Sequence, residues 1–136
     1  MKFATLPDGG ADGRLLLVSC DLRHAVDAAP IATTLADVLD RWDALAPRLQ
    51  ARYDALNAGS VPDARPFHPA ACAAPLPRSP QWCDGSAFLN HGRLMEQAFN
   101  TPPIPMFDTV PVMYQGASDD FLGPASDVPL PDEADC

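Results

Sequence analysis

The chain has 136 residues, of which 47% are apolar and 20% charged, and its formal net charge at pH 7 is -9. This length gives room for one average domain or for two small ones. An acidic chain without a basic stripe is poorly suited to nucleic-acid backbones and to anionic membrane surfaces, so we expect neither partner. Its 16 prolines lie well above the average usage of about 5% and predict that loops form much of the chain.

The N-terminus and the cysteine pattern bear on the cellular compartment of the protein. No apolar run approaches the roughly 20 residues of a transmembrane helix, and residues 1–7 are too short for a signal peptide. The cysteines form no Cys-x-x-Cys pair, and combining Cys72 and Cys83 with His68 and His91 fits no structural zinc pattern. We therefore expect free thiols in a cytoplasmic protein. The four cysteines are Cys20, Cys72, Cys83 and Cys136.

The first 30 residues predict a small antiparallel sheet. Residues 2–6 and 14–19 have the pattern of short strands, and the glycines and aspartates of residues 7–13 favour a hairpin loop between them. Residues 22–25 are a candidate third strand. The run 15–18 is continuously apolar rather than alternating, which favours burial on both faces but leaves a helix open on periodicity alone.

The clearest helical signal follows, with apolar residues at spacings of three and four. Thr34 and Asp37 have the form of a capping box at its start. Pro47 lacks an N–H and clashes with the preceding turn, so we expect a kink there or a second helix starting near it. Gly59 suits the left-handed residue after the last turn. The apolar residues of the pattern are Leu35, Val38, Leu39, Trp42, Leu45, Ala46, Leu49, Tyr53 and Leu56.

A proline-rich stretch predicts the boundary between two domains, 1–78 and 79–136. Residues 60–80 contain six prolines, which favour an extended path and exclude a continuous helix. Beyond it, residues 88–99 have one broad apolar helical face, with Ser86 placed to cap the helix.

The last part of the chain is expected to be mostly loop. The predicted helix ends before Thr101, and residues 107–114 include a candidate strand. From Gly116 to Gly123, and in the acidic tail, the composition indicates loop.

Three side chains are candidates for chemistry. Asp84 precedes a glycine, so it is either a turn aspartate or an oxygen ligand of a hard cation such as Mg²⁺ or Ca²⁺. His91 lies seven residues later, too far for two helical ligands of one ion, which favours separate roles. It is either a core histidine or a base that takes a proton from water. Tyr114 either packs or directs its hydroxyl at a substrate oxyanion.

Serine hydrolase and nucleotide-binding functions find no support, because no nucleophile elbow and no phosphate-binding loop occur. Asp119 and Asp120 read as solvated loop charges.

Several short sequence motifs are each weak evidence for a family, but their order and spacing together are specific. They are Lys2-Phe3-Ala4-Thr5-Leu6, Asp12-Gly13-Arg14, Ala74-Pro75-Leu76-Pro77-Arg78, Gln81-Trp82, Asp84-Gly85-Ser86-Ala87-Phe88-Leu89-Asn90-His91, Met113-Tyr114-Gln115-Gly116 and Ser118-Asp119-Asp120-Phe121-Leu122-Gly123-Pro124. Together with the helical region they resemble the fumarylacetoacetate hydrolase family, in particular bacterial members with a small N-terminal domain. The resemblance covers nearly the whole chain. It implies an α+β fold, with a small strand-plus-helix domain at 1–78 followed by the beginning of a mixed β-roll catalytic domain at 79–136.

The resemblance also implies roles for the three candidate residues. Asp84 would be a ligand of Mg²⁺ or Ca²⁺, His91 the catalytic base and Tyr114 a substrate contact. The implied reaction is metal-dependent hydrolysis of a carbon–carbon bond in a small diketo acid, of the acylpyruvate or fumarylacetoacetate type. Other members decarboxylate or isomerise related compounds, and we expect a homodimer by the same resemblance.

The sequence departs from the family pattern at several positions. The Glu-x-Glu pair and further aspartate of the metal site, and the lysine and glutamate that assist the histidine, have no counterpart, since the chain stops at residues 131–136. Asn100 stands where some members have an arginine. We therefore expect an N-terminal portion of the enzyme that alone binds metal poorly and has little activity. The alternative is a non-catalytic assembly module that pairs through unpaired sheet edges.

Overall fold

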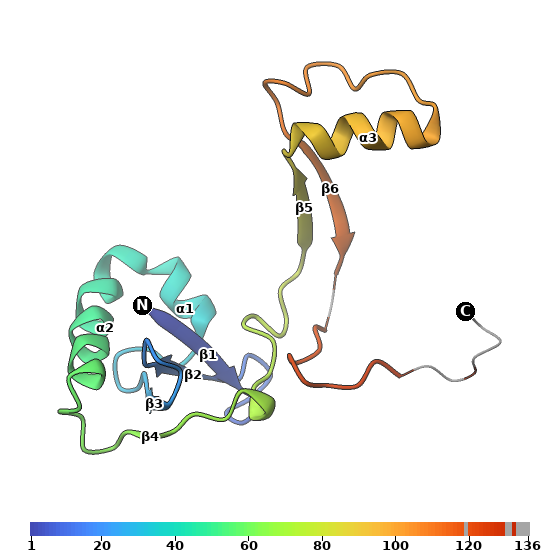
Figure 1. Ribbon diagram of the computed structural model, residues 1–136. Coiled ribbons are helices and arrows are strands. Elements are labelled where there is room, and N and C mark those ends of the chain that lie inside the picture. The colour runs from blue at the N-terminus through green and yellow to red at the C-terminus, as the bar shows by residue number, and fades with distance from the viewer. Residues whose placement is uncertain (119, 130–131, 133–136) are drawn as a thin grey trace. The chain divides into compact units, whose positions relative to one another are not determined.

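The computed structural model describes residues 1–118, 120–129 and 132 (Figure 1). Contacts divide the chain into two compact units, Ser79–Asp119 and a unit made of Met1–Arg78 with the chain from Asp120 onward. Helices and two small sheets make the chain α+β, as predicted. Within the residues described, no helix is both long and apolar enough to cross a membrane.

The first unit is built on a four-stranded antiparallel sheet in the order β1-β2-β3-β4. Its strands are β1 (Lys2–Leu6), β2 (Arg14–Val18), β3 (His24–Asp27) and β4 (Arg65–Pro66). The predicted hairpin is confirmed, with Leu6 opposite Arg14.

The third strand begins two residues later than the sequence predicted. Leu22 has a φ of 62°, a left-handed conformation that belongs to turns and not to strands. The turn is closed by Ser19, whose N–H donates to the His24 carbonyl at 2.9 Å and whose hydroxyl accepts from the His24 N–H at 3.0 Å. The strand therefore starts at His24 and continues to Asp27.

The apolar run of β2 is buried on both faces of the sheet, as expected. Leu15 and Leu17 belong to the main core, together with residues of β3 and the helices. Leu16 and Val18 belong to a second cluster on the opposite face, where Phe67 packs against them. Burial on both faces explains why the strand shows no alternation.

Two helices follow, α1 (Leu35–Asp40) and α2 (Trp42–Asn57). The predicted cap is confirmed, since the Thr34 hydroxyl accepts from the Asp37 N–H at 3.1 Å. Gly59, at φ 70°, follows the last turn as predicted.

The break between the helices corrects the prediction made from Pro47. It falls at Arg41, whose backbone is not helical and whose carbonyl accepts from the N–H groups of Ala44 and Leu45 at 3.1 Å. Helix α2 continues through Pro47. A proline forfeits one backbone hydrogen bond near the helix start, whereas packing of Leu45 and Leu49 into the core holds both sides of it.

The proline-rich stretch contains β4 and a 3₁₀ turn, η1 (Pro69–Ala71). It then follows the outer edge of β1, where the Ala73 N–H donates to the Thr5 carbonyl at 2.8 Å and the Thr5 hydroxyl donates to the Pro75 carbonyl at 2.8 Å. These bonds cover an edge that would otherwise be free to pair with another chain.

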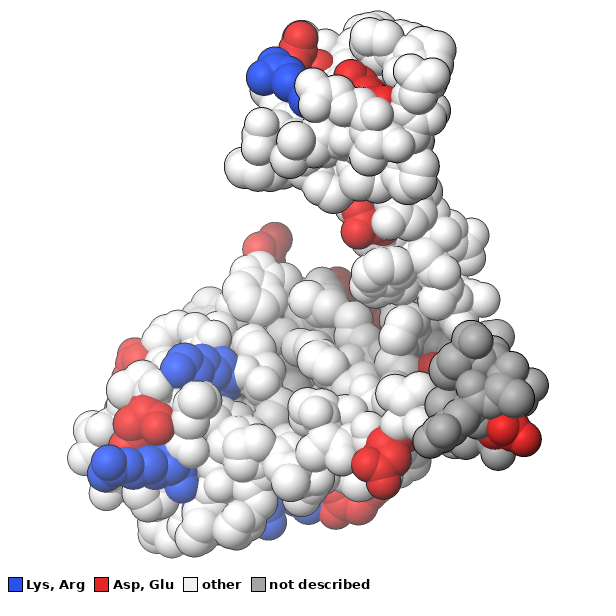
Figure 2. All heavy atoms as spheres, turned by 45° about the vertical axis from the view of Figure 1, so that its right-hand side comes forward, with Lys and Arg blue, Asp and Glu red and all other residues white. Residues whose placement is uncertain are grey.

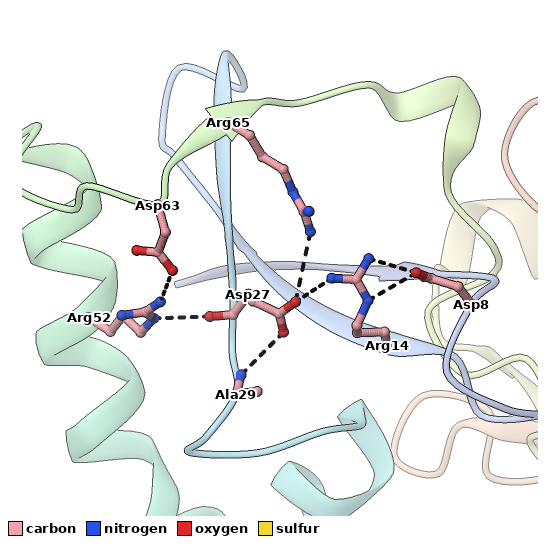
Figure 3. Close-up of polar contacts among 7 residues, drawn as sticks. All are labelled: Asp8, Arg14, Asp27, Ala29, Arg52, Asp63 and Arg65. Atoms are coloured by element: carbon pink, nitrogen blue, oxygen red, sulfur yellow. Dashed lines mark hydrogen bonds and ion pairs between the residues drawn. The ribbon is translucent and has the colours of Figure 1, made fainter.

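Ion pairs connect the strands and loops of the first unit (Figure 3). Arg14 on β2 lies between Asp8 and Asp27 and binds both carboxylates. Arg65 on β4 approaches Asp27 to 3.8 Å, and the Arg52 Nε of α2 donates to the Asp27 carbonyl at 3.0 Å. On the face seen in Figure 2, basic side chains of this unit lie beside acidic ones rather than forming a stripe.

The second unit is a β-hairpin with one helix. Its elements are β5 (Trp82–Ser86), β6 (Val112–Ala117) and α3 (Leu89–Phe99). The hairpin places Asp84 opposite Tyr114 and Ser86 opposite Val112.

Two predictions for the second unit need correction. Ser86 ends β5 and does not cap α3, whose N-cap is Phe88. The strand expected within 107–114 is present and begins at Val112, but it runs through Gly116, which was assigned to a loop. Gly116 is needed in that strand because a Cβ there would lie 1.6 Å from the Trp82 ring.

Candidate functional site

Asp84 lies in the middle of β5 rather than in the turn that one interpretation assigned to it. The hydroxyl of Ser86 donates to the Asp84 Oδ1 at 2.9 Å. Residues two apart on a strand share a face, so this bond runs along one side of the hairpin. It fixes one carboxylate oxygen of Asp84 and leaves the other for a further partner.

His91 lies in the first turn of α3 and its side chain is exposed. The core-histidine interpretation is therefore wrong, because no apolar cluster encloses the ring. An exposed imidazole exchanges protons with water and is accessible to a small molecule.

Tyr114 lies on β6 and its side chain is 53% exposed. This exposure allows both interpretations of Tyr114, a packed ring with its hydroxyl in water and a hydroxyl directed at a substrate. Because Tyr114 pairs across the hairpin with Asp84, the phenol and the carboxylate come from directly opposed positions.

The structure brings His91 and Tyr114 to one hollow of about 250 Å³. Ser86 also lines this hollow, so its hydrogen bond to Asp84 joins the third candidate residue to the same place. Residues that carry an imidazole, a phenol and a serine hydroxyl thus line one volume. Such a group can hydrogen-bond the oxygens of a small polar molecule and can move a proton.

The wall of the hollow behind His91 is set by contact between Gly92 and Phe107. Gly92 is buried, and a Cβ built on it would lie 2.0 Å from the Phe107 Cε1. The aromatic ring therefore rests directly on the helix backbone. Phe107 belongs to the connection between α3 and β6, so this contact anchors that connection to the helix.

The described residues do not by themselves fit a divalent metal ion. Mg²⁺ and Ca²⁺ take six or more oxygen ligands, and Asp84 supplies one carboxylate. Within the part of the chain that the structure describes, no group of three His, Cys, Asp or Glu side chains is placed to hold an ion. Asp120 belongs to the first unit, and Asp119 lies outside the described residues.

Sequence reasoning missed the walls of the hollow and the partner of Asp84. Ser86 was assigned to a helix cap, and only the strand places its hydroxyl on Asp84. Met95 and Phe99 were part of the predicted apolar helix face, and their spacing of four and eight residues from His91 was a usable signal. No local pattern marked Phe107.

A comparison with known families bears on the first unit. The family model described as fumarylacetoacetase N-terminal domain 2 matches residues 1–78. The chain belongs to this family. The match agrees with the resemblance based on the sequence motifs and indicates a hydrolase family. No curated protein matches the chain.

The matched residues include the four-stranded sheet, helices α1 and α2, and most of the proline-rich stretch. Asp84, His91 and Tyr114 lie beyond them. The family match therefore does not bear on the roles of these three residues.

Proposed function

We propose that this fumarylacetoacetase-family chain serves the hydrolytic cleavage of a carbon–carbon bond in a diketo acid of the acylpyruvate or fumarylacetoacetate type. The observation that carries the proposal is the hollow shared by His91 and Tyr114. A diketo acid presents carbonyl oxygens that accept a hydrogen bond from the Tyr114 hydroxyl, whereas the Ser86 hydroxyl donates its one proton to Asp84. It also contains the electrophilic carbon that a deprotonated water attacks.

The chain's own residues would move the proton. His91 takes a proton from water as the water oxygen bonds to the ketone carbon, and the Tyr114 hydroxyl donates to the oxygen that becomes negative. The adjacent carbon–carbon bond then breaks, and its electron pair leaves on the enolate. Protonation of the enolate carbon by the imidazolium gives a carboxylic acid and a methyl ketone, and restores neutral His91.

A divalent cation, Mg²⁺ or Ca²⁺, enters the proposal only as an ion to which the Asp84 carboxylate would be a ligand. Such a cation would supply Lewis-acid chemistry, and no step above depends on it. We place the activity in the cytoplasm, which the free thiols of Cys20, Cys72 and Cys83 support.

The test is binding of an acylpyruvate to the full chain, monitored by NMR through the imidazole resonances of the histidines. The chain has three histidines, and His24 and His68 in the first unit are internal controls. We expect the ring resonances of His91 to shift on titration while those of His24 and His68 do not. Tyr114→Phe removes only the hydroxyl and should weaken binding, with Tyr53→Phe as the matched control.

We expect this chain alone to hydrolyse the compound only slowly, and the rate is compared between wild type and His91→Ala, with His68→Ala as the control. Loss of hydrolysis on His91→Ala alone would support the base role. Shifts at His24 or His68 equal to those at His91, or no binding at all, would overturn the proposal.

A second candidate function is assembly, including the homodimer. Its support is the exposure of large apolar side chains in the second unit, among them Phe88 at 74%, Phe99 at 67% and Met106 at 68%. Within the described residues β5 and β6 pair only with each other, so their outer edges are open. Self-association in size-exclusion chromatography that Phe88→Ser abolishes would favour assembly, whereas a monomer at all concentrations would count against it.

A further inference from the structure

The hollow beside His91 has both polar and apolar lining residues. Ser86, Tyr114 and His91 contribute hydroxyls and an imidazole where α3 begins. Residues four and eight positions further along a helix lie on the same face, and Met95 and Phe99 line the hollow at those positions. The lining thus extends about 12 Å along the helix from His91, at 1.5 Å per residue.

Further apolar side chains line the hollow. Phe107 lies on Gly92, next to His91, and Ile104 lies in the same connection between α3 and β6. Val112, opposite Ser86 in the hairpin, adds to the apolar lining near the start of α3, and Thr101 lies in the lining beyond Phe99. Together with Met95 and Phe99, the apolar side chains offer dispersion contacts and an aromatic surface, which favour the removal of an apolar group from water.

The charges of the hollow oppose a second carboxylate. No Lys or Arg is among the lining residues. Arg93 is the single basic residue between 79 and 119, and its guanidinium pairs with Asp108 at 3.5 Å, outside the lining. Glu96 does line the hollow, and its Oε1 accepts from the Ile104 N–H at 3.0 Å.

We infer that the hollow selects a diketo acid whose acyl group is uncharged and apolar, aromatic or branched aliphatic, over one whose acyl group carries a second carboxylate. This inference rests on the proposed function and names its substrate class. The diketo portion lies beside Ser86, His91 and Tyr114, and the acyl group lies along Met95 and Phe99, further along α3. A second carboxylate would lose water without gaining a cation and would face Glu96.

Three matched probes test the inference on the full chain by calorimetry: benzoylpyruvate, its 4-carboxy derivative and its 4-carbamoyl derivative. The last two are nearly equal in size and differ in charge. We expect the carboxy probe to bind about tenfold more weakly than the carbamoyl probe, since its carboxylate would lie near Glu96 with no Lys or Arg in the lining. Glu96→Gln keeps a side-chain oxygen that can accept from the Ile104 N–H. It should reduce the difference in affinity between the carbamoyl and carboxy probes several-fold.

A pair of neighbouring variants tests the apolar wall. Met95→Ala should weaken benzoylpyruvate binding several-fold, whereas Leu94→Ala, which removes an apolar side chain from the same helix outside the lining, should not. Equal loss from both variants would overturn the placement of the acyl group.

The outcomes separate this inference from the proposed function. Equal affinities of the carboxy and carbamoyl probes overturn the inference and leave the proposed function standing. If both then bind more weakly than benzoylpyruvate, the size of the acyl group decides the affinity and its charge does not. If no probe binds, the proposed function and the inference both fall.

Discussion

Gly92 is the residue on which the shape of the hollow depends most closely. Alanine is ordinarily the better helix former by about 1 kcal/mol. Here, however, its Cβ would lie 2.0 Å from the Phe107 ring. We expect Gly92→Ala to displace Phe107, which NMR would detect as a change in the ring-current shifts of α3 and as weaker probe binding.

The control for Gly92→Ala is the same substitution made in a Phe107→Ala background. With the ring removed, the alanine should be tolerated and the helix content by circular dichroism should rise. If Gly92→Ala leaves the Phe107 resonances unchanged in the otherwise native chain, the contact described above is wrong.

Two aspartates of the first hairpin loop predict a dependence of stability on pH. Hydrogen bonding from Arg14 holds the pKa of Asp8 below its ordinary value, and hydrogen bonding from Arg78 does the same for Asp12. A carboxyl whose pKa is lower in the folded state stabilises fully above its unfolded pKa of about 4, and this stabilisation is lost as pH falls through the folded pKa. We therefore expect a level melting temperature near neutral pH and a decline below about pH 4.

Asp12→Asn should make that decline shallower, because one of the groups that link protonation to folding is removed. Asp40→Asn in α1 serves as the control. A decline unchanged by Asp12→Asn, measured by thermal melts from neutral pH into the acid range, would show that the pair with Arg78 does not form in solution.

At the scale of elements, the start of α1 depends on one hydroxyl. Thr34 accepts from the Asp37 N–H at 3.1 Å, while the neighbouring Thr33 is exposed and contributes its backbone carbonyl to the Leu15 N–H. We expect Thr34→Ala to lower the free energy of unfolding by about 1 kcal/mol, the usual cost of a lost N-cap. Thr33→Ala should change it much less, and equal effects in denaturant titrations would contradict the assignment of the cap.

The elements that the sequence predicted well are those specified locally. The hairpin of β1 and β2, the Thr34 cap and the glycine after α2 follow from turn and cap chemistry within a few residues. The break at Arg41 could not be predicted, because Pro47 gave a stronger local signal and the packing of Leu45 and Leu49 overrode it.

The candidate site was predictable only in part for the same reason. His91 and Asp84 were found from their spacing and a family resemblance. Tyr114 lies 23 residues after His91 in the chain. The two residues line the same hollow only because β5 pairs with β6. Ser86 changed role because a residue that ends a strand and one that caps a helix look alike in sequence.

For the molecule as a whole, the two units differ in how much they bury. Both apolar clusters lie in the first unit, where the side chains of Leu15, Leu17 and Leu49 are fully buried. In the second unit Gly92 is the only buried residue among those described, and large apolar side chains remain exposed. Burial of apolar area is the main favourable term in folding, so the two units should differ in stability.

Amide hydrogen exchange followed by mass spectrometry should make this difference visible. We expect the amides of β2 and β3 to exchange only on global unfolding, and those of β5, β6 and α3 to exchange much faster through local opening.

If the second unit instead becomes protected as the chain is concentrated, apolar surface is being covered by another copy, which would favour assembly over the small-molecule site. Protection of the second unit by benzoylpyruvate in dilute solution would favour the site. Equal protection of both units in dilute, ligand-free solution would contradict the assignment of the cores, because stability would then not follow buried apolar area.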